Sequence, residues 1–321
     1  MSLPQQINWR SRAETHNLMH ILMIFLDGIG LGENDPSVNP FAVAQMPTLT
    51  ALTNGQRWLN GIGRQEGARA TFIPTDARLG VAGRPQSASG QAAILTGKNV
   101  PQMIGEHYGP KPNAPIRELI AQDNFFKQVV THGKTGALLE AYPPRFHQVI
   151  NSGKRLRSSY QQAVHEAGLP LLGEDSIYDG TGLAVDWVGE GWRKELGYSD
   201  TPVYTPHEAG RRMVELSRQY DFAFFSHWLT DLVGHRGPLE DGVALLELFD
   251  GVMAGALEAW DDDEGLMIIT SDHGNLEDIS HRNHTENDVP TLVIGREKTR
   301  FDHSFSDLTH FVPRMADLLL K

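Results

Sequence analysis

The sequence predicts an α/β protein with a doubly wound, mostly parallel sheet and helices on both of its faces. Three observations predict this class. Short apolar runs recur along the chain, the first of them at 21–26. Glycine or a polar residue ends these runs at once, as Asp27-Gly28 ends the first. Segments with helical spacing alternate with the runs, and such alternation is typical of parallel strands joined by helices.

The individual elements follow from local patterns, in chain order. The apolar runs predict strands at 21–26, 70–75, 135–141, 221–226, 266–270 and 291–294. Proline suits a first helical turn and glycine suits a helix end, so Pro47 starts a helix and Gly97 ends another. The expected helices are 47–52, 87–96, 116–130, 207–219, 240–260 and 307–320.

The alternation stops between 143 and 204. Pro143-Pro144 opens this stretch, Thr205-Pro206 follows it, and a basic run, Lys154-Arg155-Leu156-Arg157, lies inside it. We therefore expect an inserted cap at 143–204 over a catalytic core made of 20–142 and 205–321. A polar N-terminal arm is expected at 1–19.

Composition limits the partners of the chain. The 321 residues carry a formal net charge of −12, which argues against nucleic acid or an anionic membrane as the main partner. Cysteine is absent, so disulfides, thiolate metal sites and a cysteine nucleophile are excluded. The longest apolar run is far shorter than the roughly 20 residues of a membrane span, and the first nineteen residues have no signal-peptide pattern. We expect a cytoplasmic protein; its oligomeric state stays open.

Side chains that bind metals gather beside the ends of the predicted strands, where open α/β sheets bind ligands. They are Asp27, Asp231, His235, Asp272, His273 and His284, with Ser87 at the start of a helix. Each alone has an ordinary explanation, such as a turn, a helix cap or a surface ion pair. Their convergence on one edge of the sheet predicts a metal site.

The chemistry that fits these residues is two-metal phosphoryl transfer, because two cations about 3.5–4 Å apart hold the attacking and leaving oxygens. The first predicted site consists of Asp231, His235 and His284, and the second of Asp27, Asp272, His273 and Ser87. Oxygen and imidazole ligands without sulfur favour Mn²⁺, with Zn²⁺ as the alternative.

Ser87, and not Ser89, is the predicted nucleophile. A residue at a helix N-terminus has unpaired backbone N–H groups beside it, which bind an anionic phosphoryl group. Ser89 would point roughly 200° around the helix. Gly90 costs about 1 kcal/mol relative to alanine inside a helix, which indicates a close approach to the backbone.

Three blocks of the sequence resemble one known superfamily. They are ILMIFLDGIGLGENDPSVNPFAVAQMPTLTAL, HWLTDLVGHRG and TSDHGNLEDISHRNHTENDVPTLVIG. They resemble the alkaline phosphatase superfamily, most closely its branch of cofactor-independent phosphoglycerate mutases and related metalloenzymes. The resemblance implies an alkaline-phosphatase-like core, the same metal ligands, and a mutase or phosphatase acting on a small phosphorylated metabolite. Ser87, Gly90 and Gly97 keep the spacing of the mutase nucleophile block, whereas Gln91 replaces its histidine.

The stretch at 143–204 departs from the mutases, whose long second domain grips phosphoglycerate with arginines and an Arg-Asp pair. Candidate substrate contacts are Arg84, Arg145, Arg155 and Arg157, since guanidinium groups bind phosphate or carboxylate at two points. A solvated basic face explains the last three as well. The loop with His107, Tyr108 and Lys111 could line the site, but its glycine and proline residues favour a turn-rich surface loop. A phosphodiesterase or sulfatase on the same core, or a non-catalytic metal-binding protein, remain as alternatives.

Overall fold

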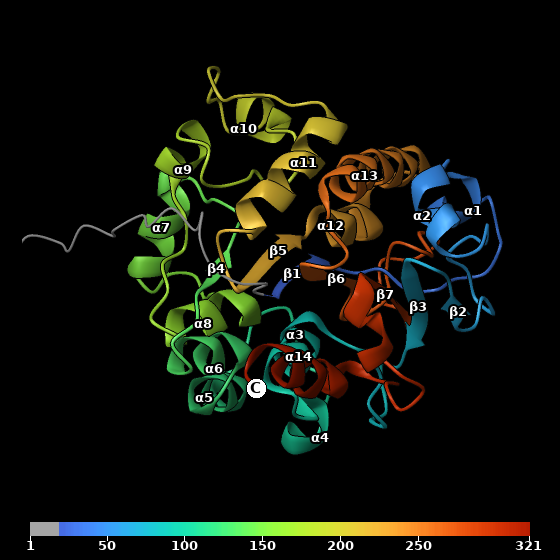
Figure 1. Cartoon of the computed structure of the whole chain (residues 1–321), viewed down its shortest axis with the longest axis horizontal. Helices are drawn as coiled ribbons and strands as arrows, with labels where there is room; N and C mark the ends of the chain where they lie inside the picture. Colours follow the sequence, from blue (N-terminus) through green and yellow to red (C-terminus); the bar gives the residue numbers. More distant parts are fainter. Residues whose placement is uncertain (1–18) are drawn as a thin grey trace, which may run out of the picture.

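The computed structural model describes residues 19–321 and has the predicted α/β class. Within these residues, one seven-stranded sheet has the order β2-β3-β7-β6-β1-β5-β4 (Figure 1). Its strands are β1 His20–Leu26, β2 Gln65–Glu66, β3 Ala70–Thr75, β4 Gly136–Leu138, β5 Phe222–His227, β6 Gly265–Thr270 and β7 Val289–Ile294. Apart from its last residue, the arm expected at 1–19 lies outside the described residues.

The direction of β7 positions the loop that follows β6. Strands β4, β5, β1 and β6 pair in parallel, whereas β7 runs antiparallel to both β6 and β3. Because β7 returns in the opposite direction, the loop at 271–288 begins and ends at the edge where β1 and β5 also end. The sheet is therefore mixed, and its antiparallel strand keeps the loop beside the carboxyl ends of its neighbours.

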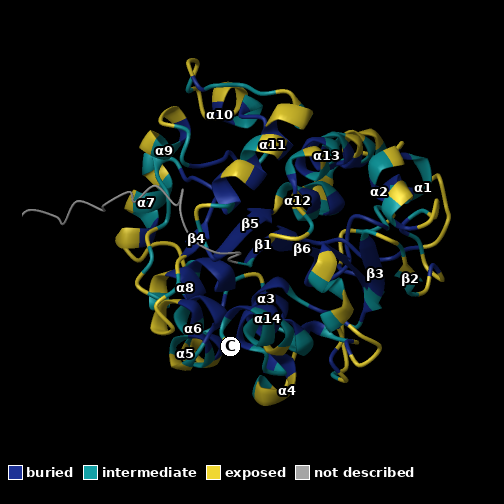
Figure 2. Cartoon of the chain, viewed as in Figure 1, coloured by how far each residue is buried: buried dark blue, intermediate teal, exposed yellow. Residues whose placement is uncertain are grey.

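Helices cover both faces of the sheet (Figures 1 and 2). Alternate residues of β1 enter different cores: Ile21 and Met23 belong to one cluster, Leu22 and Ile24 to the other, and all four are fully buried. Burial on both faces explains why the strand is apolar throughout. The first core includes helices α3 Ser87–Thr96, α5 Ala114–Gln122, α6 Phe125–Thr131, α8 Ser159–Glu166 and α14 Phe311–Leu319. The second includes α1 Pro40–Val43, α2 Pro47–Leu52, α11 Pro206–Ser217 and α13 Leu239–Ala259.

Three predicted elements differ from the structure by more than a shift of one or two residues at their ends. The helix expected at 116–130 is two helices, because Asp123 is extended and the Asn124 side chain caps α6. The strand expected at 135–141 shortens to β4. The helix expected at 307–320 opens with a 3₁₀ turn, Leu308–His310, whose N-cap is Asp307. The remaining helices are α4 Val100–Ile104, α7 Pro144–Asn151, α9 Glu174–Tyr178, α10 Glu190–Lys194 and α12 Leu229–Arg236, with a 3₁₀ helix at Arg296–Arg300.

The stretch at 143–204 contains short helices, α7 to α10, and it is tied closely to the core. Isolated bridges pair Glu140 with Leu183 and Ala141 with Leu172. Tyr160, on α8, belongs to the same buried cluster as β1. The boundary of the cap stays a prediction, since α8 packs as part of the helical layer on the sheet. Across residues 19–321, no helix has the length and apolar character that crossing a membrane requires.

Strand β5 ends in a buried histidine that holds this stretch against the sheet. His227 Nδ1 lies 2.7 Å from the carbonyl oxygen of Val185, and its ring stacks on Trp187 at 3.8 Å between centroids. Trp187 has a φ of 60°, a region that bulky residues avoid. His227 Nε2 is buried without a hydrogen-bond partner among the described residues, and burial lowers the pKa of His227 to about 4.

This burial predicts a loss of stability in acid. The unfolded chain binds a proton at His227 near pH 6.5, whereas the folded chain stays neutral there until about pH 4. The free energy of unfolding should therefore fall by about 3 kcal/mol from this residue as the pH drops through that window. Urea titrations across the window should show a flatter pH dependence for His227→Phe, which keeps a stacking ring. The exposed His132→Phe should retain the wild-type slope, and equal slopes in all three proteins would contradict the assignment.

Candidate metal centre

Ser87 is the first residue of α3 and lies in the wall of a buried polar cluster. Its side chain is almost fully enclosed, and its Oγ lies 3.0 Å from Nε2 of His273. Within residues 19–321, the backbone N–H groups of Ser87 and Ala88 have no hydrogen-bond partner. The helix therefore presents a hydroxyl and two free N–H groups at its positive end.

Ser89 has a different surrounding. Its Oγ accepts a hydrogen bond from Tyr108 N at 3.0 Å, and its own N–H donates to the Tyr108 carbonyl at 3.0 Å. Its hydroxyl also donates to the carbonyl of Gln86 at 3.2 Å. These bonds hold the loop around Tyr108 against the first turn of α3. The Ser89 hydroxyl therefore contacts backbone atoms and does not contact the buried polar cluster.

Gly90 allows α3 to touch the loop after β6. A Cβ at this position would lie 2.9 Å from both the Cβ and the carbonyl oxygen of Asp272. Real Cβ atoms do not approach so closely, so any side chain would push α3 away. The close approach expected from the glycine is therefore made by Asp272.

The first group of ligand atoms comes from α12 and the loop before β7. Asp231 and His235 are one helical turn apart on α12, and Asp231 Oδ1 lies 3.4 Å from His235 Nε2. His284 Nε2 lies 3.6 Å from the same oxygen and 3.2 Å from His235 Nε2. The three ligand atoms lie within 4.8 Å of one another, close enough to hold one ion.

The second group shares a member with the first. Asp27, at the end of β1, has Oδ1 3.3 Å from Nε2 of His273. In this second group, the ligand atoms of Asp27, Asp231 and His273 lie within 4.8 Å of one another. Asp272 Oδ1 lies 3.7 Å from the same His273 nitrogen. All members of the second predicted site are therefore adjacent, and Asp231 lies within reach of both groups.

The three histidines are oriented in the same way. Each Nδ1 faces a backbone carbonyl, at 2.7 Å for His235 to Arg282, 2.8 Å for His284 to Pro85 and 3.3 Å for His273 to Gly274. When Nδ1–H donates to a carbonyl, the lone pair of Nε2 faces the cluster. This arrangement is typical of histidines that bind metals.

Negative charge is concentrated in this buried place. Burial raises the pKa values of Asp27 and Asp272, and the neighbouring carboxylates raise them further. Burial opposes protonation of His273, but Asp272, Asp27 and Asp231 together raise its pKa to about 10. In the part of the chain that the structure describes, no lysine or arginine forms an ion pair with these carboxylates. A buried acidic cluster with histidine lone pairs facing it fits divalent cations.

Two amide side chains that the sequence analysis did not assign to the site hold the carboxylates. Gln91 Nε2 lies 3.3 Å from Asp27 Oδ2 and 3.2 Å from Asp272 Oδ2. Asn275 Nδ2 donates to Asp231 Oδ1 at 2.7 Å. Gln91 was visible as the residue that replaces the mutase histidine, and Asn275 lies two residues after His273, but only their contacts reveal this role.

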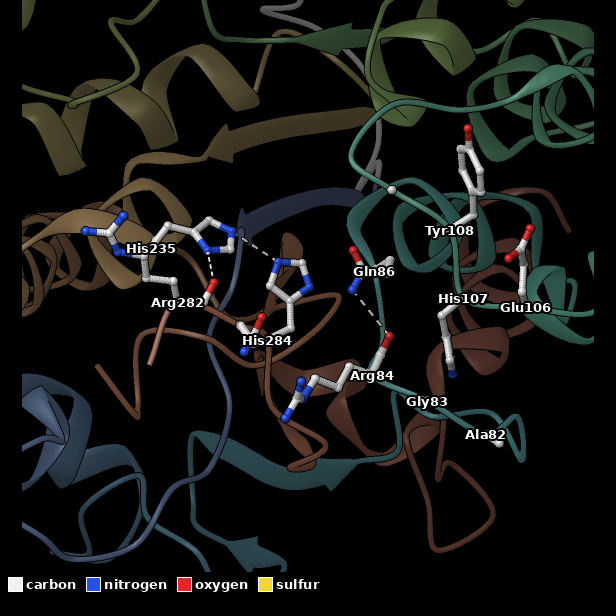
Figure 3. A pocket seen from close by; sticks show the side chains of 12 residues that line it. Ala82, Gly83, Arg84, Gln86, Glu106, His107, Tyr108, His235, Arg282 and His284 are labelled. Carbon is white, nitrogen blue, oxygen red and sulfur yellow. Dashed lines mark hydrogen bonds between the residues drawn. The ribbon is translucent and has the colours of Figure 1, made fainter. Parts of the chain in front are cut away.

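The other candidates lie around this cluster. Arg84, His107 and Tyr108 line a cavity of about 540 Å³ beside His235 and His284 (Figure 3). His107 and Tyr108 therefore line this cavity from a partly exposed loop, which Ser89 holds against α3.

Arg145, Arg155 and Arg157 do not line this cavity. Arg155 is 5.6 Å from the ring centroid of Phe146. Burial lowers the pKa of the Lys111 ammonium, and the charge of Arg155 lowers it further. Arg157 is half-buried, and Arg145 is exposed on α7 without a contact to the cluster. Lys111 is half-buried, and the charge of Asp27 acts on its ammonium group. It therefore lies closer to the cluster than a residue of an exposed surface loop would.

Comparison with known proteins supports the resemblance to metalloenzymes and phosphoglycerate mutases that the sequence blocks indicate. Residues 202–318 match the Metalloenzyme superfamily. The 2,3-bisphosphoglycerate-independent phosphoglycerate mutase of Methylobacillus flagellatus is 32% identical over 135 residues, which are 39% of this chain and 26% of that enzyme. The mutase of Laribacter hongkongensis is 31% identical over 137 residues, 40% of this chain and 26% of the enzyme. The matched part thus spans about a quarter of the length of these relatives.

Solved structures share the fold over almost the whole chain. A protein from Pyrococcus horikoshii superimposes with a TM-score of 0.56 at 16% identity, covering 94% of this chain and 97% of the other. The alkaline phosphatase of the Antarctic bacterium TAB5 gives a TM-score of 0.50 at 12% identity, covering 94% and 98%. The fold is therefore alkaline-phosphatase-like. The likeness to the Metalloenzyme superfamily spans residues 202–318, and the likeness of fold spans almost the whole chain.

The contact between α3 and Asp272 predicts the effect of Gly90→Ala. Alanine in a helix interior normally adds about 1 kcal/mol of stability relative to glycine. Here the new methyl group meets Asp272, so the variant should lose roughly 1–3 kcal/mol, the usual cost of overpacking. Chemical denaturation measures the change, and titration with Mn²⁺ should show weaker binding. An increase in stability would contradict the contact.

Proposed function

We propose that this protein is a two-metal phosphoryl-transfer enzyme that uses Ser87 as the nucleophile on a small phosphorylated metabolite. The observation that carries the proposal is the convergence of three histidine Nε2 atoms and three carboxylates beside Ser87. The mutase and phosphatase names of the similar proteins support the reaction class.

The two groups of ligand atoms would each hold one cation. Asp231, His235 and His284 hold one, and Asp27, Asp272, His273 and Ser87 hold the other, with Asp231 close to both. The cations supply positive charge that lowers the pKa of the Ser87 hydroxyl and neutralises the phosphoryl group. The ligand types favour Mn²⁺, with Zn²⁺ as the alternative, because oxygen and nitrogen atoms make up the set.

The chain contributes orientation and hydrogen bonds. The free N–H groups at the start of α3 and the helix dipole favour a phosphoryl oxygen beside Ser87. Gln91 and Asn275 hold the carboxylates, and backbone carbonyls hold the imidazoles. Ser87 Oγ takes the phosphoryl group as the substrate alcohol leaves, and the group then passes to water or to another hydroxyl.

The accepting group decides between a phosphatase and a mutase. About a third of the His235 side chain is exposed, at 32%, whereas the His273 side chain is fully buried. Water therefore reaches the first group from the cavity, which favours hydrolysis. A panel of phosphorylated metabolites, assayed with Mn²⁺ for both phosphate release and isomerisation, tests the assignment. Aryl phosphate, phosphodiester and sulfate esters assayed in parallel separate the three ester classes.

The two serines of the first turn should respond differently to alanine. Ser87→Ala should abolish turnover and the trapped phosphoenzyme, because no other hydroxyl at this helix end faces His273. Ser89→Ala should keep turnover and lose about 1 kcal/mol of stability, the value of a typical hydrogen bond. Intact-mass mapping of the trapped adduct checks the site; phosphate on Ser89, or near-normal rates in Ser87→Ala, would overturn the assignment.

Loss of a histidine should remove one cation. His235→Ala should lower the bound metal from about two per chain toward one and reduce turnover strongly, since one oxygen of the displacement loses its charge partner. The exposed His132→Ala is the matched control and should keep both ions. Elemental analysis after exhaustive dialysis gives the stoichiometry. Full occupancy with normal turnover in His235→Ala would remove this residue from the site.

A further inference from the structure

The cavity beside the first ligand group is built from separate segments of the chain. The loop before α3 contributes Arg84, the loop after α4 contributes His107, and the loop before β7 contributes Arg282. His235 and His284 form the wall that belongs to the metal centre (Figure 3). The remainder of a substrate whose phosphoryl group lies at Ser87 would therefore extend into this space.

Two guanidinium groups line this cavity without an ion-pair partner among the described residues. Arg84 and Arg282 are both exposed, and neither forms an ion pair within residues 19–321. Elsewhere arginines such as Arg69 and Arg78 are paired with aspartates. In a chain with a net charge of −12, two unpaired arginines on one cavity indicate an anion from outside.

The backbone beside each arginine is part of the metal centre. The carbonyl of Arg282 itself accepts from His235 Nδ1, and the carbonyl of Pro85, next to Arg84, accepts from His284 Nδ1. The two main-chain positions are therefore set by the same hydrogen bonds that orient the imidazoles. This coupling fixes the main chain from which the two arginine side chains extend beside the metal centre.

We propose that Arg84 and Arg282 form an anion-binding subsite that takes a second anionic group, a carboxylate or a phosphate, on the substrate. The inference rests on the proposed function and deepens it, because it makes the substrate a metabolite with two anionic groups. Glu106, at the opposite side of the same cavity, disfavours an anion there (Figure 3). The two arginines thus act in substrate recognition and orientation.

Unreactive phosphonates test the subsite by binding alone. Calorimetry on the Mn²⁺-loaded protein compares propylphosphonate, which has one anionic group, with phosphonopropionate and propylene bisphosphonate, which have two. The wild type should prefer the ligands with two anionic groups by about tenfold or more. The double variant R84Q/R282Q should lose that preference. R236Q, the same charge change at the residue after His235 but outside the cavity lining, should keep it. Comparison of the carboxylate and phosphonate ligands identifies the preferred anion.

The outcomes separate the subsite from the proposed reaction. An unchanged preference in the double variant, or no preference in the wild type, overturns the subsite. If either of these results is found together with a phosphoenzyme on Ser87, the proposed reaction is still supported. An arginine-dependent preference without a phosphoenzyme supports the subsite and overturns the nucleophile. A loaded protein that binds none of the three phosphonates overturns both.

Discussion

The repulsion among three neighbouring carboxylates is the constraint on which this structure depends. Asp27, Asp231 and Asp272 meet at one edge of the sheet, where burial makes every unneutralised charge expensive. His273 takes up part of that charge, and Gln91 and Asn275 share hydrogen bonds among the oxygens. A protein folded only for stability would not collect such groups. Their presence is explained by the cations that we propose.

The strand directions of the sheet and one glycine bring these carboxylates together. Parallel β1 and β5 end at the same edge and deliver Asp27 and the start of α12. The antiparallel β7 keeps the loop of Asp272 and His284 at that edge. Gly90 then lets α3 touch Asp272, which brings Ser87 to His273. Each step depends on backbone position, so the fold itself brings these side chains together.

The cavity and the candidate metal centre are built partly from the same loop, which joins β6 to β7. The cavity is lined by the loops around Arg84, His107 and Arg282, and the last of these loops also carries the proposed ligands His273 and His284. The hydrogen bonds from His235 and His284 to loop carbonyls connect the two parts. A change in either loop would therefore also affect the orientation of the imidazoles.

The sequence by itself determined the α/β class, most strand and helix positions, and the residue types that meet at the sheet edge. It did so because apolar runs and glycine or proline signals report burial and backbone conformation over a few residues. It could not show that Asn124 divides a helix, that Asp231 reaches both groups, or that Gln91 bridges two aspartates. Those features depend on contacts between segments far apart in the chain, such as Asp27 and His273. Only the register of the strands and the packing of α3 decide which of these side chains touch.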